Sequence, residues 1–497
     1  MESEQKKNSY NHILKYTGLF GGVQGLAILV GVIRNKLVAL LLGPDGMGII
    51  SLFNSTVKLL SDSTNMGIPM SGVKNISQYF DDNHMAALNR QVKMIRSLSL
   101  FTGLVGMVLS MVLSPLLGRY SMNYGNHVMH YVCLSPVVLL TALMGGEMAI
   151  LKGVRQLKPL AKASVANIVA ATLISLPLYF VWGISAIVPS LVLVALAEYV
   201  ITARLSFAIF PLRLMALKPA LHTGWSMLKL GISFVLAGVM GSGADFLIRA
   251  FLSKHAGLDV VGLYSAGYTI TMQYAGLVFA AMETDYFPRL SGIRTVCPKL
   301  SATVNSQIEV TLLLLSPLLV AFMIGAPLLL PLLYSHKFIP VLAMVQITVL
   351  AMYVRAFKLP MAYLPLAQGH SGIYLLLESI YDVAVTVFVV VGYLLGGLSG
   401  TGVALLSASV FDMIVILIVT RYKYHYHVSR QATVLMLIQL ALGVLALGIT
   451  FCHSGWMYWC GGLLVFLMSS AVSIGQLRRN SDILQTLKNK INRKFNG

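Results

Sequence analysis

Charged side chains are scarce in this sequence. Asp, Glu, Lys and Arg make up only 11% of the 497 residues, whereas soluble proteins carry about 25%. Hydrophobic residues make up 57% and form continuous runs without the period-two alternation of barrel strands. A run of about 20 apolar residues spans a bilayer, where the backbone must satisfy its own hydrogen bonds. The composition therefore excludes a soluble domain and predicts an all-α polytopic membrane protein.

Residue patterns that support catalysis or metal binding are also missing. The four cysteines have no paired spacing, which argues against a zinc site or a disulfide framework. The chain has no Walker A, HExxH or GxSxG motif, so we predict no catalytic residue, no metal and no cofactor. The net charge of +19 comes from short loops rather than from a basic domain with interleaved aromatics, which argues against nucleic acid as a partner.

The apolar runs predict about fourteen transmembrane helices. The first is long for one crossing and is expected to tilt, bend or project beyond the lipid. The predicted spans are 13–42, 47–69, 97–117, 130–151, 162–181, 184–208, 225–250, 260–284, 308–333, 340–366, 373–396, 400–420, 431–452 and 455–476.

Lys and Arg residues in the loops and near the ends of the spans lie mostly on one predicted side of the membrane. With the N-terminus inside, 27 of them fall in cytoplasmic segments and 3 (Arg119, Lys254 and Lys337) on the opposite side. The positive-inside rule therefore predicts that both termini are cytoplasmic. Residues 477–497 have apolar positions along one side and predict a cytoplasmic amphipathic tail that lies on anionic membrane lipid.

An internal repeat divides the chain into two halves. Residues 43–51 (GPDGMGIIS) and 257–265 (GLDVVGLYS) share four identities at one spacing. Residues 69–74 (PMSGVK) match 288–294 (PRLSGIR) with one insertion. Six helices separate the copies, and this even number predicts a parallel repeat, an architecture of alternating-access transporters.

The repeat predicts four parts of the chain. Two six-helix lobes cover residues 1–210 and 211–424. Two extra transmembrane helices cover 425–476, and the amphipathic tail covers 477–497.

Six further basic residues remain, all inside predicted spans, where an isolated charge costs several kcal/mol and is usually found in a cavity or beside a partner. Arg249 has Asp245 four residues before it, so a structural ion pair and a ligand site are both open for it. Arg34 and Lys36 have no acid at helical spacing, so we predict that they line a cavity and contact an anion there. The six residues are Arg34, Lys36, Lys58, Arg249, Arg355 and Lys358.

Arg355 and Lys358 share one helical face with no acid at helical spacing. Either an anionic ligand or acids of another helix should balance them, and Glu378 and Asp382 on the next predicted helix are the candidates. Two carboxylates four residues apart in a low dielectric can also share a proton. Glu378 and Asp382 are therefore equally well read as a coupling-ion site.

Three segments resemble a known family. Residues 34–48 (RNKLVALLLGPDGMG) are similar to the first-helix signature of Wzx-type O-antigen translocases. Residues 153–161 (GVRQLKPLA) and 286–291 (YFPRLS) resemble that family's helix 4–5 loop and helix-8 exit motif. The resemblance covers helices 1 to about 12 and points to the polysaccharide-exporter branch of the multidrug/oligosaccharidyl-lipid/polysaccharide (MOP) superfamily.

The resemblance implies a flippase in the bacterial inner membrane that moves undecaprenyl-pyrophosphate-linked oligosaccharide repeat units to the periplasmic leaflet. It implies an inward-facing V of two six-helix lobes with a pyrophosphate site between them, and Arg34 occupies the position of a cavity-lining basic residue in related lipid II flippases. We extend this expected site to Lys36, Arg249, Arg355 and Lys358. A proton or sodium ion is the expected coupling ion, with Asp245, Glu378 and Asp382 as coupling-ion or ion-pair candidates, and the glycan polymerase machinery is an expected partner.

Three other functions compete with this interpretation. A cation-coupled multidrug exporter would need an acid-dominated cavity, whereas this chain places basic residues in its spans. A membrane-embedded glycan polymerase or ligase generally has large periplasmic loops, whereas the longest predicted outward loop, around residues 118–129, is short. A lipid II flippase would have the same fold and is separated only by complementation.

Overall fold

The described part of the chain consists of membrane-length helices. The computed structural model describes residues 2–82, 84–121, 127–274, 279, 286–287, 289–293, 298–451 and 455–480, with side chains described from residue 29 onward in most of these ranges. Every regular element in these ranges is a helix, and ten stretches are long and apolar enough to cross a membrane. The predicted all-α polytopic fold class is confirmed.

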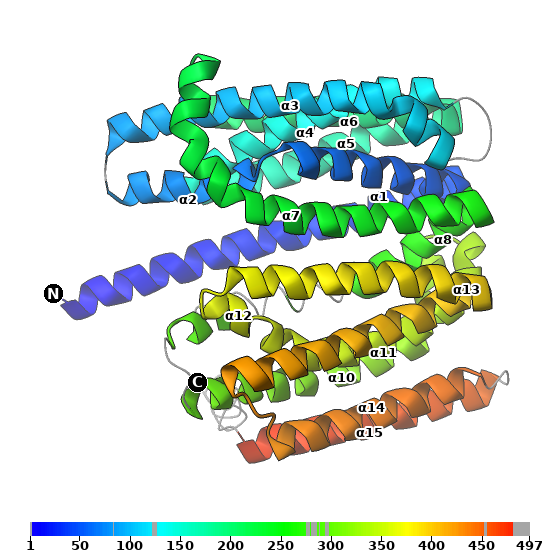
Figure 1. Cartoon of the computed structure of the whole chain (residues 1–497). Helices are drawn as coiled ribbons and strands as arrows, with labels where there is room; N and C mark the ends of the chain where they lie inside the picture. The colour runs from blue at the N-terminus through cyan, green and yellow to red at the C-terminus, as the bar shows by residue number, and fades with distance from the viewer. Residues whose placement is uncertain are drawn as a thin grey trace, which may run out of the picture. The chain divides into compact units, whose positions relative to one another are not determined.

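The chain divides into two compact units. Unit 1 comprises Met1–Leu263 and Leu332–Lys337, and its helices α3 to α6 run side by side in Figure 1. Its complete elements are α1 (Glu2–Thr64), α2 (Ile68–Asp81), α3 (Met85–Ser121), α4 (Val128–Gly153), α5 (Leu157–Trp182), η1 (Gly183–Ala186), α6 (Ile187–Phe207) and α7 (Leu217–Ala256).

Unit 2 comprises Tyr264–Pro331 and Phe338–Gly497. Helix α8 (Leu258–Tyr268) begins in unit 1 and ends in unit 2, and the paired helices α14 and α15 lie together in Figure 1. The other elements are η2 (Thr269–Tyr274), α10 (Pro298–Leu333), η3 (His336–Val341), α11 (Leu342–Ala362), α12 (Leu364–Ala367), α13 (Ser371–Tyr424), α14 (Arg430–Thr450) and α15 (Gly455–Asn480).

Three of the ten long stretches contain an internal break that separates two predicted spans. Helix α1 breaks at Gly43, α13 breaks at Gly396 and Gly397, and η1 separates α5 from α6. Division at these breaks turns ten stretches into thirteen. The remaining predicted span, 260–284, begins in α8 and η2 and continues outside the described residues. The predicted tail helix lies beyond Asn480 and is also outside them.

Two features differ from the predicted division of the chain. A short amphipathic helix, α2, follows the second span, where the sequence predicted a loop; Gly67, in the left-handed conformation, caps its start. The compact units divide after Leu263, whereas the repeat predicted lobes that divide at residue 210. The repeat identifies segments that are duplicated in the sequence, whereas the compact units are defined by how the helices pack. The packing therefore does not test the predicted lobe boundaries, which stay a prediction.

The first glycine of each repeated segment makes the turn between consecutive helices. Gly43 has φ 66° and separates the two arms of α1, and Gly257 has φ 106° and separates α7 from α8. Positive φ is accessible to glycine at little cost. The repeat therefore encodes the same turn twice, at equivalent places in the two halves.

The second repeated glycine allows the two copies to touch. A Cβ atom on Gly48 would lie 1.9 Å from the Leu258 carbonyl oxygen, and one on Gly262 would lie 1.9 Å from that of Pro44. The Cβ atom added to Gly48 would also lie 3.1 Å from the Gly262 backbone nitrogen, and the one added to Gly262 would lie 3.0 Å from the Gly48 nitrogen. Equivalent residues contact each other reciprocally where a two-fold relation connects two repeats. Close backbone approach through small residues is the usual basis of helix association in lipid.

A buried arginine fixes the loop that follows the sixth predicted span in unit 1. Arg96 of α3 forms a two-point ion pair with Glu147 of α4, at 2.8 and 3.1 Å. Its guanidinium also donates to the carbonyls of Phe210 and Pro211 at 3.0 and 2.8 Å. Since Arg96 is only 3% exposed, these bonds are what make its burial tolerable.

Unit 2 has a comparable anchor at the loop that follows α13. The Asn305 side chain of α10 donates to the His427 carbonyl at 3.1 Å. Its oxygen accepts from the Tyr426 hydroxyl and the Ser429 backbone N–H at 2.7 and 2.9 Å. In each unit, a polar side chain near the start of a membrane helix therefore holds a loop more than a hundred residues away.

The glycine contact makes a specific stability prediction. In Gly48→Ala, the new methyl group would overlap a backbone carbonyl that no side-chain rotation can move. We expect destabilisation at or above the upper end of the about 1–3 kcal/mol typical of overpacking. The thermal unfolding midpoint of the detergent-purified protein measures it. The control is Gly372→Ala, where a Cβ meets nothing within 4 Å; equal midpoints for both variants would contradict the packing role.

Candidate functional site

Arg34 lies in α1, nine residues before the Gly43 break, and is partly buried. Its Nε donates to the Ser175 hydroxyl of α5 at 3.3 Å. Glu198 of α6 and Tyr179 of α5 lie within electrostatic range of the guanidinium. The sequence showed only that α1 offers no acid at helical spacing; the nearby carboxylate comes from another helix. Lys36, two residues further along α1, is also partly buried.

Arg249 forms the ion pair that its spacing predicted. Its Nη1 lies 2.9 Å from the Asp245 carboxylate, one turn earlier in α7. Its Nε donates to the Ser51 hydroxyl of α1 at 2.8 Å. Of the two interpretations left open for Arg249, the structure therefore contains the ion pair. Asp245 is held in this pair, and the hydrogen bond from Arg249 to Ser51 links α7 to α1.

Lys358 pairs with an acid that the sequence did not single out. Its Nζ forms a hydrogen-bonded ion pair with Asp412, in the second arm of α13, and lies 4.4 Å from the centroid of the Tyr381 ring. Of the two predicted candidates, Glu378 lies within electrostatic range of Lys358, and the pairing with Glu378 and Asp382 stays a prediction. Spacing identifies neighbours on one helix, whereas the Lys358–Asp412 pair spans 54 residues. Both partners are buried, at 7% and 5% exposure, so each is the other's main compensation.

Arg355 is held by apolar and polarisable groups. Its guanidinium contacts the Met272 sulfur in η2 at 3.8 Å and lies 5.4 Å from the centroid of the Phe279 ring. Glu378 lies within electrostatic range of Arg355, Lys358 and Asp412. The cluster therefore combines two cations with two carboxylates, which matches the expectation that acids of another helix approach this face. A π-helix such as η2 is rare and often found at functional sites.

The buried Arg96–Glu147 pair was missed as a specific contact. No sequence spacing relates these two residues, which lie 51 positions apart. Within the described ranges, no group of three or more His, Cys, Asp or Glu residues is arranged to hold a metal ion.

Solved structures with the same arrangement of helices are transporters. A lipid II flippase, MurJ, in an inward closed conformation matches with TM-score 0.71 and 14% identity, over 92% of this chain and 99% of that one. An inward-facing multidrug resistance transporter of the MATE family matches with TM-score 0.67 and 16% identity, over 80% and 94%. A MOP transporter from Pyrococcus furiosus, described by the reverse polarity of its binding pocket, matches with TM-score 0.52 and 16% identity, over 82% and 93%. The chain is thus a multi-pass membrane protein with the fold of the MOP superfamily.

A sequence-family model places the chain more narrowly. The model described as "Polysaccharide biosynthesis protein" matches residues 37–343, more than half of the chain. The protein belongs to this polysaccharide biosynthesis family. No curated protein matches the sequence. The polysaccharide part of the sequence resemblance is confirmed, while the O-antigen assignment stays a prediction.

The Lys358–Asp412 pair predicts a non-additive mutant cycle. Lys358→Met alone and Asp412→Leu alone each leave an uncompensated buried charge and should destabilise unit 2 by about 3–5 kcal/mol. The double variant removes both charges and should recover most of that loss. Unfolding midpoints of the three purified variants measure the coupling. Additive losses would show that the two side chains act independently.

Proposed function

We propose that this protein is a flippase that moves an undecaprenyl-pyrophosphate-linked oligosaccharide repeat unit, of O-antigen or a related surface polysaccharide, from the cytoplasmic to the periplasmic leaflet by alternating access. Membership of the polysaccharide biosynthesis family supports the glycan part of the proposal. The MOP fold, which is found in a lipid II flippase, supports the transport of a lipid-linked head group.

The observation that carries the proposal is the environment of two guanidinium groups in the membrane. The described partners of Arg34 and Arg355 are a hydroxyl, a thioether and an aromatic ring, and no carboxylate lies at ion-pair distance among them. The planar guanidinium forms two-point hydrogen bonds to phosphate oxygens. We assign both groups to the pyrophosphate, together with Lys36. Arg249 and Lys358 are ion-paired, so we assign them a structural role: they stabilise the helices that carry the site.

The chemistry of the substrate sets the task. Its polyprenyl tail is already soluble in the bilayer, so the protein has to shield only the pyrophosphate and the glycan. Outward movement of an anion is favoured by a negative interior, by about 2.3 kcal/mol per charge per 100 mV. Bound guanidinium groups lower the net charge that moves and reduce this contribution. A proton or sodium ion taken up at Glu378 and Asp382, which lie one turn apart on α13, would reset the empty carrier.

A lipid II flippase is the second candidate function. The lipid II flippase structure aligns with 92% of this chain, against 80% for the drug transporter, so the likeness extends over more of the chain. Both candidate substrates carry a pyrophosphate on a polyprenyl chain, and the same cationic groups serve both. Complementation in two different hosts separates them.

Export should depend on both guanidinium groups. In a Gram-negative strain that lacks its own O-antigen translocase, the wild-type chain should restore surface polymer on an immunoblot. Arg34→Ala and Arg355→Ala should each lower the polymer at least about tenfold, because each loses one charge-assisted contact. Arg34→Lys should recover only part, since lysine keeps the charge without the planar fork.

The control is Arg421→Ala, an exposed basic residue at the end of α13, which should export at the wild-type level. Membrane abundance is measured for every variant. Normal export by both alanine variants would overturn the cationic-site assignment. Rescue of a strain depleted of lipid II flippase, without rescue of the O-antigen strain, would establish the second candidate.

A further inference from the structure

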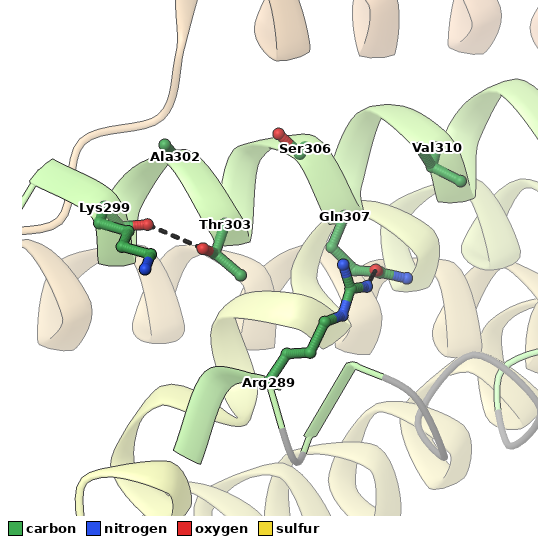
Figure 2. Close-up of a pocket in the computed structure, with 7 residues that line it drawn as sticks. All are labelled: Arg289, Lys299, Ala302, Thr303, Ser306, Gln307 and Val310. Carbon is green, nitrogen blue, oxygen red and sulfur yellow. Dashed lines mark hydrogen bonds between the residues drawn. The ribbon is translucent and has the colours of Figure 1, made fainter. Parts of the chain in front are cut away.

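A cavity of about 470 Å³ lies on unit 2. Figure 2 shows that the first turns of α10 form one wall and that Arg289, from the segment before α10, reaches toward this wall. The polar groups of the lining come from Arg289, Lys299, Thr303, Ser306 and Gln307.

The described lining of the cavity is positively charged, because it contains two basic side chains and no carboxylate. Arg289 donates from Nη2 to the Gln307 side-chain oxygen at 3.4 Å, a bond that holds the guanidinium at the edge of the cavity. The Thr303 hydroxyl donates to the Lys299 carbonyl at 2.8 Å, so its proton is already used. The two cations can donate charge-assisted hydrogen bonds to the oxygens of a phosphate group.

The same face of α10 becomes apolar immediately beyond the cavity. Lys299, Thr303, Ser306 and Val310 follow one another at helical spacing, and Leu314 and Leu318 continue the line. Val310, Leu314 and Leu318 are 41%, 49% and 57% exposed, within a stretch that is apolar enough to cross the membrane. A polar, cationic end is therefore joined to an exposed apolar stripe, at the end of α10 that the charge distribution places at the cytoplasmic surface.

We propose that this cavity binds the phosphate head group of an anionic glycerophospholipid of the surrounding bilayer, with an acyl chain against Val310, Leu314 and Leu318. A soluble anion would use the cations but would leave the stripe unused. The combination of charge and stripe is what selects a lipid. Neither Arg34 nor Arg355 lines the cavity, so the inference holds whichever glycan the protein carries.

The experiment uses the full-length protein purified in a neutral detergent. Phosphatidylglycerol is titrated in, and the thermal unfolding midpoint is followed; phosphatidylcholine and inorganic phosphate are titrated in parallel. Phosphatidylglycerol should raise the midpoint in a saturable way, and the other two should not. In Arg289→Gln/Lys299→Gln, the phosphatidylglycerol concentration for half the effect should rise about tenfold or more.

Two further variants distinguish the cavity from general surface charge. Arg421→Gln/Lys423→Gln removes two exposed cations elsewhere on unit 2 and should titrate like the wild type. Ala302→Trp fills the cavity without a change in charge and should weaken the lipid effect. An equal loss in the Arg421/Lys423 variant would overturn the site in favour of diffuse attraction, and an equal effect of inorganic phosphate would overturn the assignment to a lipid.

Discussion

The structure depends on the reciprocal contact of Gly48 and Gly262. Lipid supplies no hydrophobic force that drives helices together, so association relies on close van der Waals packing and on polar contacts. At this contact each repeat places its glycine against the backbone of the other, and a single Cβ on either side would overlap a carbonyl oxygen. The turn glycines Gly43 and Gly257 set the direction of the helices that meet there. One nine-residue segment, present twice, thus provides both the turn and the contact.

Polar side chains hold the helices where the membrane offers no water. The pairs Arg96–Glu147, Arg249–Asp245 and Lys358–Asp412 each place opposite charges at direct contact distance. Breaking such a pair costs more than the pair itself contributes, because one charge remains buried alone. Glu198 and Glu378 stay outside these pairs, within electrostatic range of Arg34 and Arg355 respectively. Arg34 and Arg355, held by a hydroxyl, a thioether and an aromatic ring, are the exceptions on which the proposed pyrophosphate site rests.

The sequence predicted the fold class and the span positions because both depend on local composition. The repeat was also readable, since Gly43, Gly48, Gly257 and Gly262 have backbone roles that few other residues can take. Asp245 and Arg249 were found because four residues make one helical turn. The Lys358–Asp412 and Arg96–Glu147 contacts could not be found in this way, because helix packing brings together positions that no periodicity relates. Helix α2 was missed because a short amphipathic segment beside a long apolar span resembles a polar loop.

The Lys358–Asp412 pair also has a consequence for membrane insertion. Asp412 is synthesised 54 residues after Lys358. At translation rates of about 5–20 residues per second, α11 waits roughly 3–11 s for its partner. During that interval an unpaired lysine and Arg355 occupy a helix that must leave the translocon. Helix α11 should therefore stay beside the translocon, or beside helices already inserted, until both arms of α13 have emerged. The order of synthesis thus makes the C-terminal half of this protein dependent on delayed release into lipid.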